Sequence, residues 1–343
     1  MKAALYENVR TMRLIDRPLP QAGPGEAVVK IELCGICGTD LHIYHEGMFP
    51  PSFVPGHENV GTIFQLGEGV EGLRVGDRVA AGPPGSCGAC HYCLHGHSSL
   101  CIHGMSETNG LSRDGGFAEY MLVRDPGQML YPIPDSVPFE DAVLTDTVAT
   151  ALRGIVQSAF RMGDNVVVSG CGPIGLSAVQ LLKLGGARHV TALEVVEKKR
   201  GLAARLGADL VLDPRTEAEA LPGRIQALYS GVGADLVVEC AGVPQSLELC
   251  FNLARAGGQV LNLGAGGSPV TLIPALLAVR EIGLASSLAY TADEAKLVLS
   301  YLADGRFKTE DMVSDVIPLA DIVQKGLERL VADRSLVKVA VAP

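Results

Sequence analysis

The chain has 343 residues, an apolar fraction of 48% and a formal net charge of −10 at pH 7. Its length fits two domains, since domains usually hold about 100–200 residues. The composition excludes a mainly disordered chain, and an acidic balance without a long basic run argues against nucleic acid as a partner. No apolar stretch fits a signal peptide or a membrane span, so we expect a cytoplasmic protein that binds a small molecule and no membrane.

Residues 1 to 147 are expected to be rich in β-structure. Gly and Pro separate short apolar runs, such as 27–33 and 60–64, which are typical of strands joined by turns. From there on, a helix over 147–160 is followed by strands that alternate with helices. The runs that predict strands of a doubly wound parallel sheet are 165–169, 190–193, 210–212, 236–239 and 259–263.

The C-terminal segment contains three further predicted elements. One helix opens at a capping box formed by Thr291 and Glu294, a second is expected near 320–332, and a strand is expected over 336–341. These elements either extend the parallel sheet or return to the first domain.

Candidate metal ligands appear early in the chain. The segment Cys34-Gly-Ile-Cys37-Gly-Thr39-Asp40-Leu-His42 precedes Gly56-His57-Glu58. Thiolate, imidazole and carboxylate groups are thereby expected near strand ends, and a catalytic zinc ion uses three protein ligands and one open position. The combination favours a reactive zinc site, although each residue taken singly has an ordinary structural explanation.

A second set of candidate ligands follows in a loop and consists of Cys87, Cys90, Cys93 and Cys101. Such spacings let one irregular loop wrap a tetrahedral thiolate site. A closed structural zinc site is the preferred interpretation, because four thiolates leave no position for a substrate. An iron–sulfur cluster is the alternative. A zinc ribbon for nucleic acid would need basic and aromatic neighbours, whereas this loop offers mainly Gly, His and Ser.

A G-x-G-x-x-G sequence opens the second half of the chain, with Gly170, Gly172, Pro173, Ile174 and Gly175. It follows a three-valine strand and begins an amphipathic helix, the context in which the backbone approaches a pyrophosphate. Glu194 ends the next strand, where a carboxylate accepts hydrogen bonds from the adenosine ribose and repels a 2′-phosphate. The sequence therefore predicts NAD rather than NADP, with Lys198 and Lys199 as the counter-argument. A glycine turn that binds no nucleotide is the structural alternative.

These motifs together resemble those of the zinc-dependent medium-chain dehydrogenase/reductase superfamily over essentially the whole chain. The resemblance implies an α/β fold with a GroES-like β-rich catalytic domain at 1–147 and 285–343. It implies a Rossmann NAD-binding domain with a doubly wound parallel sheet at 148–284. It also implies two zinc ions per subunit, one catalytic and one structural, and a homodimer or homotetramer joined by edge strands near 258–288.

The resemblance assigns roles around the catalytic zinc. Cys37 and His57 match the first two ligands, Asp40 matches a carboxylate that orients the histidine, and Glu58 matches a carboxylate beside the metal. At the third ligand position the family commonly has Cys or Glu, whereas this chain has Asp146, as do some bacterial secondary-alcohol and threonine-type members. We expect Asp146 to complete the site, and a helix N-cap is its alternative role.

The resemblance also implies a reaction. Thr39 matches the hydroxyl that contacts substrate and cofactor ribose, His42 matches the outer end of a proton relay, and Thr150 matches a position beneath the nicotinamide. Hydride would pass between NAD and a secondary alcohol, such as a polyol, a vicinal diol or an amino alcohol like threonine, giving the ketone. The alternatives are a zinc-free NAD(P)H reductase of the same fold that acts on activated double bonds and a non-enzymatic nucleotide-binding protein.

The sequence also offers candidates for the walls of a substrate pocket. These are the side chains Tyr44, Phe49, Phe53, Leu111 and Phe117, each of which has a core position as its plain alternative.

Overall fold

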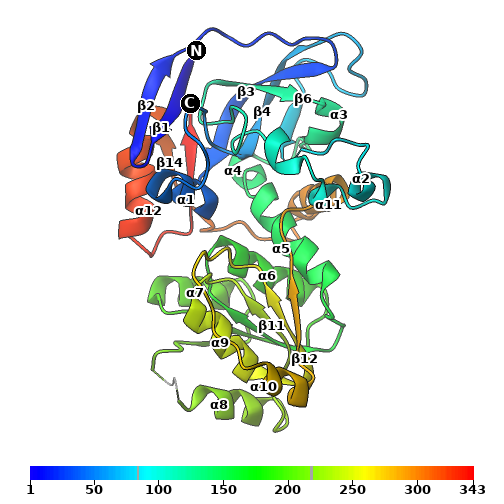
Figure 1. Ribbon diagram of the computed structural model, residues 1–343, viewed down its shortest axis with the longest axis vertical. Coiled ribbons are helices and arrows are strands. Elements are labelled where there is room, and N and C mark those ends of the chain that lie inside the picture. The colour runs from blue at the N-terminus through cyan, green and yellow to red at the C-terminus, as the bar shows by residue number, and fades with distance from the viewer. Residues whose placement is uncertain (83–84, 217–218) are drawn as a thin grey trace. The chain divides into compact units, whose positions relative to one another are not determined.

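The computed structural model describes residues 1–82, 85–216 and 219–343, which form two compact units (Figure 1). Unit 1 comprises Met1–Ala149, Ala289–Gly305 and Thr309–Pro343. Unit 2 comprises Thr150–Leu288 and Arg306–Lys308. Residues 285–288, which the sequence assigns to the catalytic domain, thus lie in unit 2, because strand β13 (Gly283–Ser286) pairs with the parallel sheet of that unit.

Unit 1 is built around a seven-stranded sheet in the order β14-β15-β3-β4-β5-β7, with β6 also pairing with β3. Its strands are β3 (Glu26–Gly35), β4 (Glu58–Leu66), β5 (Arg78–Ala81), β6 (Tyr120–Arg124), β7 (Leu130–Pro132), β14 (Val313–Pro318) and β15 (Lys338–Ala342). A separate pair is formed by β1 (Lys2–Asn8) and β2 (Thr11–Asp16). The pairings are antiparallel except for β14 with β15, so the expected β-rich domain is confirmed.

The C-terminal segment returns to unit 1 rather than extending the parallel sheet. Strand β15 pairs with β3, and in Figure 1 the red C-terminal elements lie beside the blue N-terminal ones. Buried aliphatic side chains from both ends of the chain, such as Val29, Ile63 and Val341, share one core. The strand expected over 336–341 therefore lies between β14 and β3 in the sheet of unit 1.

The helices of unit 1 are short except for α11 (Ala292–Ala303), which opens at the predicted capping box of Thr291 and Glu294. The others are α1 (Gly38–Glu46), α2 (His91–Leu94), α3 (Pro126–Met129), α4 (Phe139–Ala142) and α12 (Glu328–Ala332). Single turns of 3₁₀-helix lie at η1 (Ser98–Leu100), η2 (Gly104–Glu107) and η3 (Leu319–Asp321).

The helix expected near 320–332 is not one regular α-helix. It consists of η3, a π-helical turn η4 (Ile322–Leu327) and α12. Gly326 lies in the π-turn, and a Cβ atom there would come within 2.6 Å of Ile36 Cδ1. The chain therefore passes unusually close to the segment that follows β3, and the sequence pattern alone does not reveal this approach.

Unit 2 contains a six-stranded parallel sheet in the order β10-β9-β8-β11-β12-β13. Numbered within the unit this is the order 3-2-1-4-5-6 of the doubly wound dinucleotide-binding fold, which confirms the predicted fold class. The remaining strands are β8 (Asn165–Ser169), β9 (His189–Leu193), β10 (Leu210–Leu212), β11 (Ala234–Glu239) and β12 (Ala254–Asn262). The three valines of β8 are fully buried, as expected of a central strand covered on both faces.

Helices connect these strands. They are α6 (Pro173–Leu184), α7 (Glu197–Arg205), α8 (Leu221–Leu228), α9 (Pro244–Leu253) and α10 (Pro274–Arg280). Helix α5 (Thr145–Gln157) begins in unit 1 and continues into unit 2. None of the helices in the described part of the chain combines the length and the apolar character that crossing a bilayer requires.

Within the glycine-rich turn of unit 2, there is no space for a side chain at Gly175, but there is space at Gly172. Gly170 has a positive φ of 93°, and a Cβ atom on Gly175 would overlap the carbonyl oxygen of Gly170. Gly172, at the start of α6, has a φ of −70° and would meet no atom within 4 Å. The two glycines therefore differ in what they do: Gly175 permits helix α6 to approach β8, whereas Gly172 keeps a space open.

We expect Gly175→Ala to lower the free energy of unfolding of the metal-loaded protein by about 2 kcal/mol, because the backbone must shift to relieve the overlap. The matched variant Gly172→Ala should lower it by less than about 1 kcal/mol, the usual size of an N-cap change. Urea unfolding followed by circular dichroism measures both, and equal losses for the two variants would contradict this interpretation.

Candidate metal centres and dinucleotide-binding site

The register between β3 and β4 brings the first set of candidate ligands together. Gly35 pairs with Glu58 across the two strands, so the end of β3 meets the start of β4. Cys37 is the N-cap of α1, two residues after β3 ends, and His57 directly precedes β4. Ligand atoms of Cys37, His57 and Glu58 all lie within 4.8 Å of one another, a spacing that one metal ion can span.

Asp40 connects the backbone of Cys37 to the ring of His57. One carboxylate oxygen of Asp40 accepts a hydrogen bond from the Cys37 backbone N–H at 2.8 Å, and the other lies 3.7 Å from His57 Nδ1. Asp40 Oδ1 and His57 Nδ1 are both buried, and neither has a hydrogen-bond partner. Asp40 therefore lies beside Nδ1, and a metal bound through Nε2 would give the arrangement typical of histidine ligands, in which a carboxylate faces the other ring nitrogen.

The charges around His57 favour a cation. Burial opposes a charge on its ring, but the nearby Asp40 and Cys37 outweigh burial and raise the pKa of His57 well above its usual range. Cys37, Asp40, Glu58 and Asp146 all carry acidic groups in this part of unit 1. Buried charges of one sign need a partner of the other sign, and the set of sulfur, imidazole and carboxylate donors fits zinc.

Glu58 is held by an ion pair that the sequence did not reveal. Lys338 Nζ in β15 lies 2.6 Å from both carboxylate oxygens of Glu58, and both side chains are almost fully buried. Lys338 also donates to the carbonyl of Ile36, and the Thr147 hydroxyl donates to Glu58 at 3.2 Å. These contacts fix the carboxylate beside the cluster while occupying both of its oxygens.

Asp146, the expected third ligand, lines a small cavity together with Glu58. The cavity has a volume of only about 10 Å³, room for about one water molecule, and Glu58, Tyr131, Asp146 and Tyr290 are among the side chains that line it. Tyr290 Oη donates to Asp146 at 2.8 Å, and a side chain at Gly82 would collide with that hydroxyl. Burial raises the pKa of Asp146 to about 6.

The position of Asp146 bears on both of its expected roles. It is the second residue of α5, so it is not the N-cap of that helix. Among the described residues, the carboxylate whose oxygen lies within 4.8 Å of the ligand atoms of Cys37 and His57 belongs to Glu58 and not to Asp146. Ligation by Asp146 stays a prediction, and the structure adds Tyr290 as the residue that holds its carboxylate.

Two further predicted residues lie in α1. Thr39 Oγ1 is 3.7 Å from Cys37 Sγ, so this hydroxyl is beside the cluster. His42 is partly exposed, and its Nδ1 lies 3.0 Å from Glu46 Oε1 one turn further along the helix. Their roles in proton transfer stay predictions, but the helix places one of them next to the cluster and the other toward solvent.

The aromatic and aliphatic side chains considered for the substrate pocket have core positions instead. Phe53 and Leu111 pack with Tyr6 and Ile43 in a small cluster, against which Phe49 also packs. The others, Tyr44 and Phe117, belong to the main core of unit 1.

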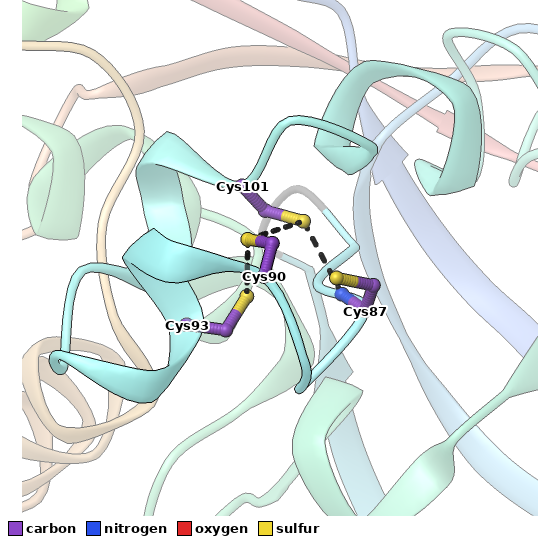
Figure 2. Close-up of side chains that lie close together, drawn as sticks. All are labelled: Cys87, Cys90, Cys93 and Cys101. Carbon is purple, nitrogen blue, oxygen red and sulfur yellow. Dashed lines mark hydrogen bonds between the residues drawn. The ribbon is translucent and has the colours of Figure 1, made fainter.

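The four cysteines of the second set converge in a loop that includes α2 and η1 (Figure 2). Cys90 Sγ lies 3.4 Å from Cys93 Sγ and 3.9 Å from Cys101 Sγ, and the backbone N–H of Cys87 donates to Cys101 Sγ at 3.3 Å. Backbone hydrogen bonds from Cys93 and Ile102 lower the pKa of Cys90 to about 6. Four converging sulfurs with backbone donors fit a closed tetrahedral zinc site.

The glycine-rich turn in unit 2 lies between β8 and α6. Helix α6 begins at Pro173 with Gly172 as an N-cap that offers no side-chain hydrogen bond, so the first N–H groups remain for a ligand. Glu194 follows β9 and is almost fully buried. Its carboxylate accepts hydrogen bonds from the backbone N–H groups of Cys171 at 2.7 Å and Val196 at 2.8 Å, which bind it to the turn.

Known families match both units. Residues 23–135 match the alcohol dehydrogenase GroES-like domain, and residues 173–304 match the zinc-binding dehydrogenase family. A (R,R)-butanediol dehydrogenase of Bacillus subtilis (strain 168) is 31% identical over 363 residues, with 100% of both chains covered. D-arabinitol dehydrogenase 1 of Uromyces fabae is 33% identical, covering 100% of this chain and 97% of its own.

A solved structure from Sinorhizobium meliloti 1021, bound to NADP, is 32% identical and superposes with a TM-score of 0.89, covering 100% of this chain and 99% of its own. The chain therefore belongs to the zinc-containing medium-chain alcohol dehydrogenase superfamily and is an NAD(P)-dependent zinc alcohol dehydrogenase.

Proposed function

We propose that this enzyme oxidises a secondary alcohol carrying a neighbouring hydroxyl or amino group to the ketone, with NAD as the hydride acceptor. Unit 1 is the catalytic domain in this proposal and unit 2 the NAD-binding domain. The observation that carries it is the convergence of Cys37, His57 and a carboxylate in unit 1. The glycine-rich turn that Glu194 closes in unit 2 supports the choice of cofactor.

Zinc bound at the first cluster supplies a Lewis acid that makes an alcohol hydroxyl acidic near neutral pH. The residues of the chain hold the metal and move the proton. Asp40 orients His57, and Lys338 and Tyr290 hold the two carboxylates that face the cavity. Thr39 would accept the alcohol proton while giving up its own hydroxyl proton, and His42, toward solvent on the same helix, would release a proton to water, a task suited to an imidazole side chain.

Two observations support the class of substrate. The relatives reported above are named for a vicinal diol and for a sugar alcohol, both of which carry neighbouring hydroxyl groups. Asp146 has a carboxylate that can accept a hydrogen bond from a second hydroxyl or an amine. Threonine, an amino alcohol, has the same pair of neighbouring groups.

The subunits are proposed to form a homodimer or homotetramer. Within the described residues, no strand pairs with the outer side of the edge strand β13, and unpaired strand edges favour association. Exposed apolar side chains on and near it, among them Val279, Leu284 and Leu288, are consistent with a covered face.

A screen of NADH formation tests the proposed reaction. We expect turnover with vicinal diols, sugar alcohols or threonine in the presence of NAD, and at least about tenfold lower kcat/KM with the matching primary alcohols. Incubation with a strong chelator should abolish NADH formation, and added zinc should restore it. Activity that survives chelation, or reduction of activated double bonds without alcohol oxidation, would instead support a zinc-free reductase.

Zinc content separates the two metal centres. We expect about two zinc ions per chain, with Cys37→Ser losing about one of them and all turnover because sulfur is a ligand there. Cys93→Ser should lose the other and lower the melting temperature. The control is Cys34→Ala, which removes a buried thiol close to Gly56 and should keep both ions. Two zinc ions in Cys37→Ser would contradict the assignment.

Replacement of Asp146 tests the third ligand. Asp146→Asn should weaken zinc binding at the catalytic site by about 100-fold or more, because a neutral amide is a poor ligand. Tyr290→Phe removes only the hydrogen bond to that carboxylate and should weaken binding by about tenfold, as outer-shell changes do. Competition with a chelator measures both. Full zinc content and normal turnover in Asp146→Asn would show that Glu58 is the third ligand instead.

A further inference from the structure

An ion cluster lies beside the segment that carries Glu194. Asp213 follows β10, Arg200 lies in α7, and Arg215 is two residues beyond Asp213. Arg200 Nη1 is 3.0 Å from Asp213 Oδ2. Arg215 donates to both carboxylate oxygens, from Nη2 at 2.7 Å and from Nε at 3.0 Å. One carboxylate therefore pairs with two guanidinium groups.

The same two arginines are attached to the backbone beside Glu194. Arg200 Nη1 donates to the carbonyl of Glu194 at 3.0 Å and to that of Val195 at 2.8 Å. Arg215 Nη2 donates to the carbonyl of Val195 at 2.7 Å. The guanidinium groups thus lie next to the residue whose carboxylate is expected to accept hydrogen bonds from the adenosine ribose.

The position of Arg200 and Arg215 affects the choice between NAD and NADP. Arginine is well suited to bind phosphate, because its planar group offers several donors in a fixed geometry. Two arginines beside the adenosine ribose would by themselves favour NADP, and a related structure does hold NADP. The side chain of Arg215 is 65% exposed and that of Arg200 25%, so solvent and ligands can reach both.

Asp213 is well placed to prevent that use of the arginines. Its side chain is only 11% exposed, and its carboxylate also accepts the Arg215 backbone N–H at 3.0 Å, so it is fixed in place. The hydrogen bond from the Arg215 side chain is the main reason that the pKa of Asp213 falls to about 2. Asp213 is therefore ionised at neutral pH and holds both guanidinium groups in ion pairs.

We propose that Asp213 is a second determinant of selectivity for NAD over NADP: it holds Arg200 and Arg215 on the Glu194–Val195 segment and so keeps them from pairing with a 2′-phosphate. Glu194 acts on the ribose directly by accepting hydrogen bonds and repelling the phosphate. Asp213 acts through the arginines and is a positioning residue. This inference rests on the proposed dinucleotide site of unit 2.

Binding of NADH and NADPH to the full-length, zinc-loaded protein tests the proposal through nicotinamide fluorescence, with no turnover required. Asp213→Asn should raise the affinity for NADPH relative to NADH by about tenfold, the size of one charge-assisted hydrogen bond. This gain in relative NADPH affinity should disappear when Arg200→Met and Arg215→Met are combined with Asp213→Asn. The matched control is Asp235→Asn, since Asp235 pairs with Arg255 elsewhere in unit 2 at 2.6 Å, and it should leave the ratio unchanged.

A second test leaves Asp213 in place, in case its replacement prevents folding. Arg215→Met is made in the Glu194→Gln background, where the acidic residue no longer repels a 2′-phosphate. If Asp213 occupies Arg215, the affinity for NADPH changes by less than about threefold. A fall of about tenfold would show that Arg215 already pairs with the phosphate and would overturn the proposal.

The remaining outcomes are also decisive. Equal changes in NADH and NADPH affinity in Asp213→Asn would show a structural role only and would refute the selectivity role of Asp213. Normal NADH binding with an unchanged ratio would refute the role of Asp213 and leave the dinucleotide site intact. Failure of the unaltered protein to bind either cofactor would refute the dinucleotide site itself, and with it this proposal.

Discussion

The constraint on which the catalytic unit depends is an excess of acidic groups in a largely buried space. Cys37, Asp40 and Glu58 approach one another there, and Asp146 lines a small cavity with Glu58. Lys338 pairs with Glu58, and the ring of His57 lies beside Asp40. A folded chain tolerates such a cluster only if the charges are neutralised or a cation enters. A zinc ion bound here would meet this requirement.

Much of the fold and of the candidate site could be predicted because the signals are local. The four cysteines lie within one loop, and the G-x-G-x-x-G turn lies between a strand and a helix that are adjacent in sequence. Local spacing restricts how such residues can be arranged, so Cys87 to Cys101 converge and Gly175 lies against the Gly170 carbonyl. The alternation of strands and helices likewise determines the parallel sheet of unit 2.

The contacts that could not be predicted join residues far apart in the chain. Lys338 reaches Glu58 because β15 pairs with β3, and Tyr290 reaches Asp146 from the start of the C-terminal segment. No spacing rule relates such residues to each other. For the same reason hydrophobicity alone could not decide whether Phe53 and Leu111 line a pocket or fill a core. The ion pairs of Asp213 with Arg200 and Arg215 likewise have no signal in the sequence.

Anomalous diffraction at the zinc absorption edge, from crystals grown with zinc and NADH, would locate the metal ions in both sites. We expect two peaks per chain, one among the four cysteines and one in contact with Cys37 Sγ and His57. The second peak should also contact the carboxylate of Asp146, with Glu58 still paired to Lys338. A single peak at the four cysteines, with Cys37 and His57 free of metal, would contradict the assignment of unit 1 as a zinc catalytic domain.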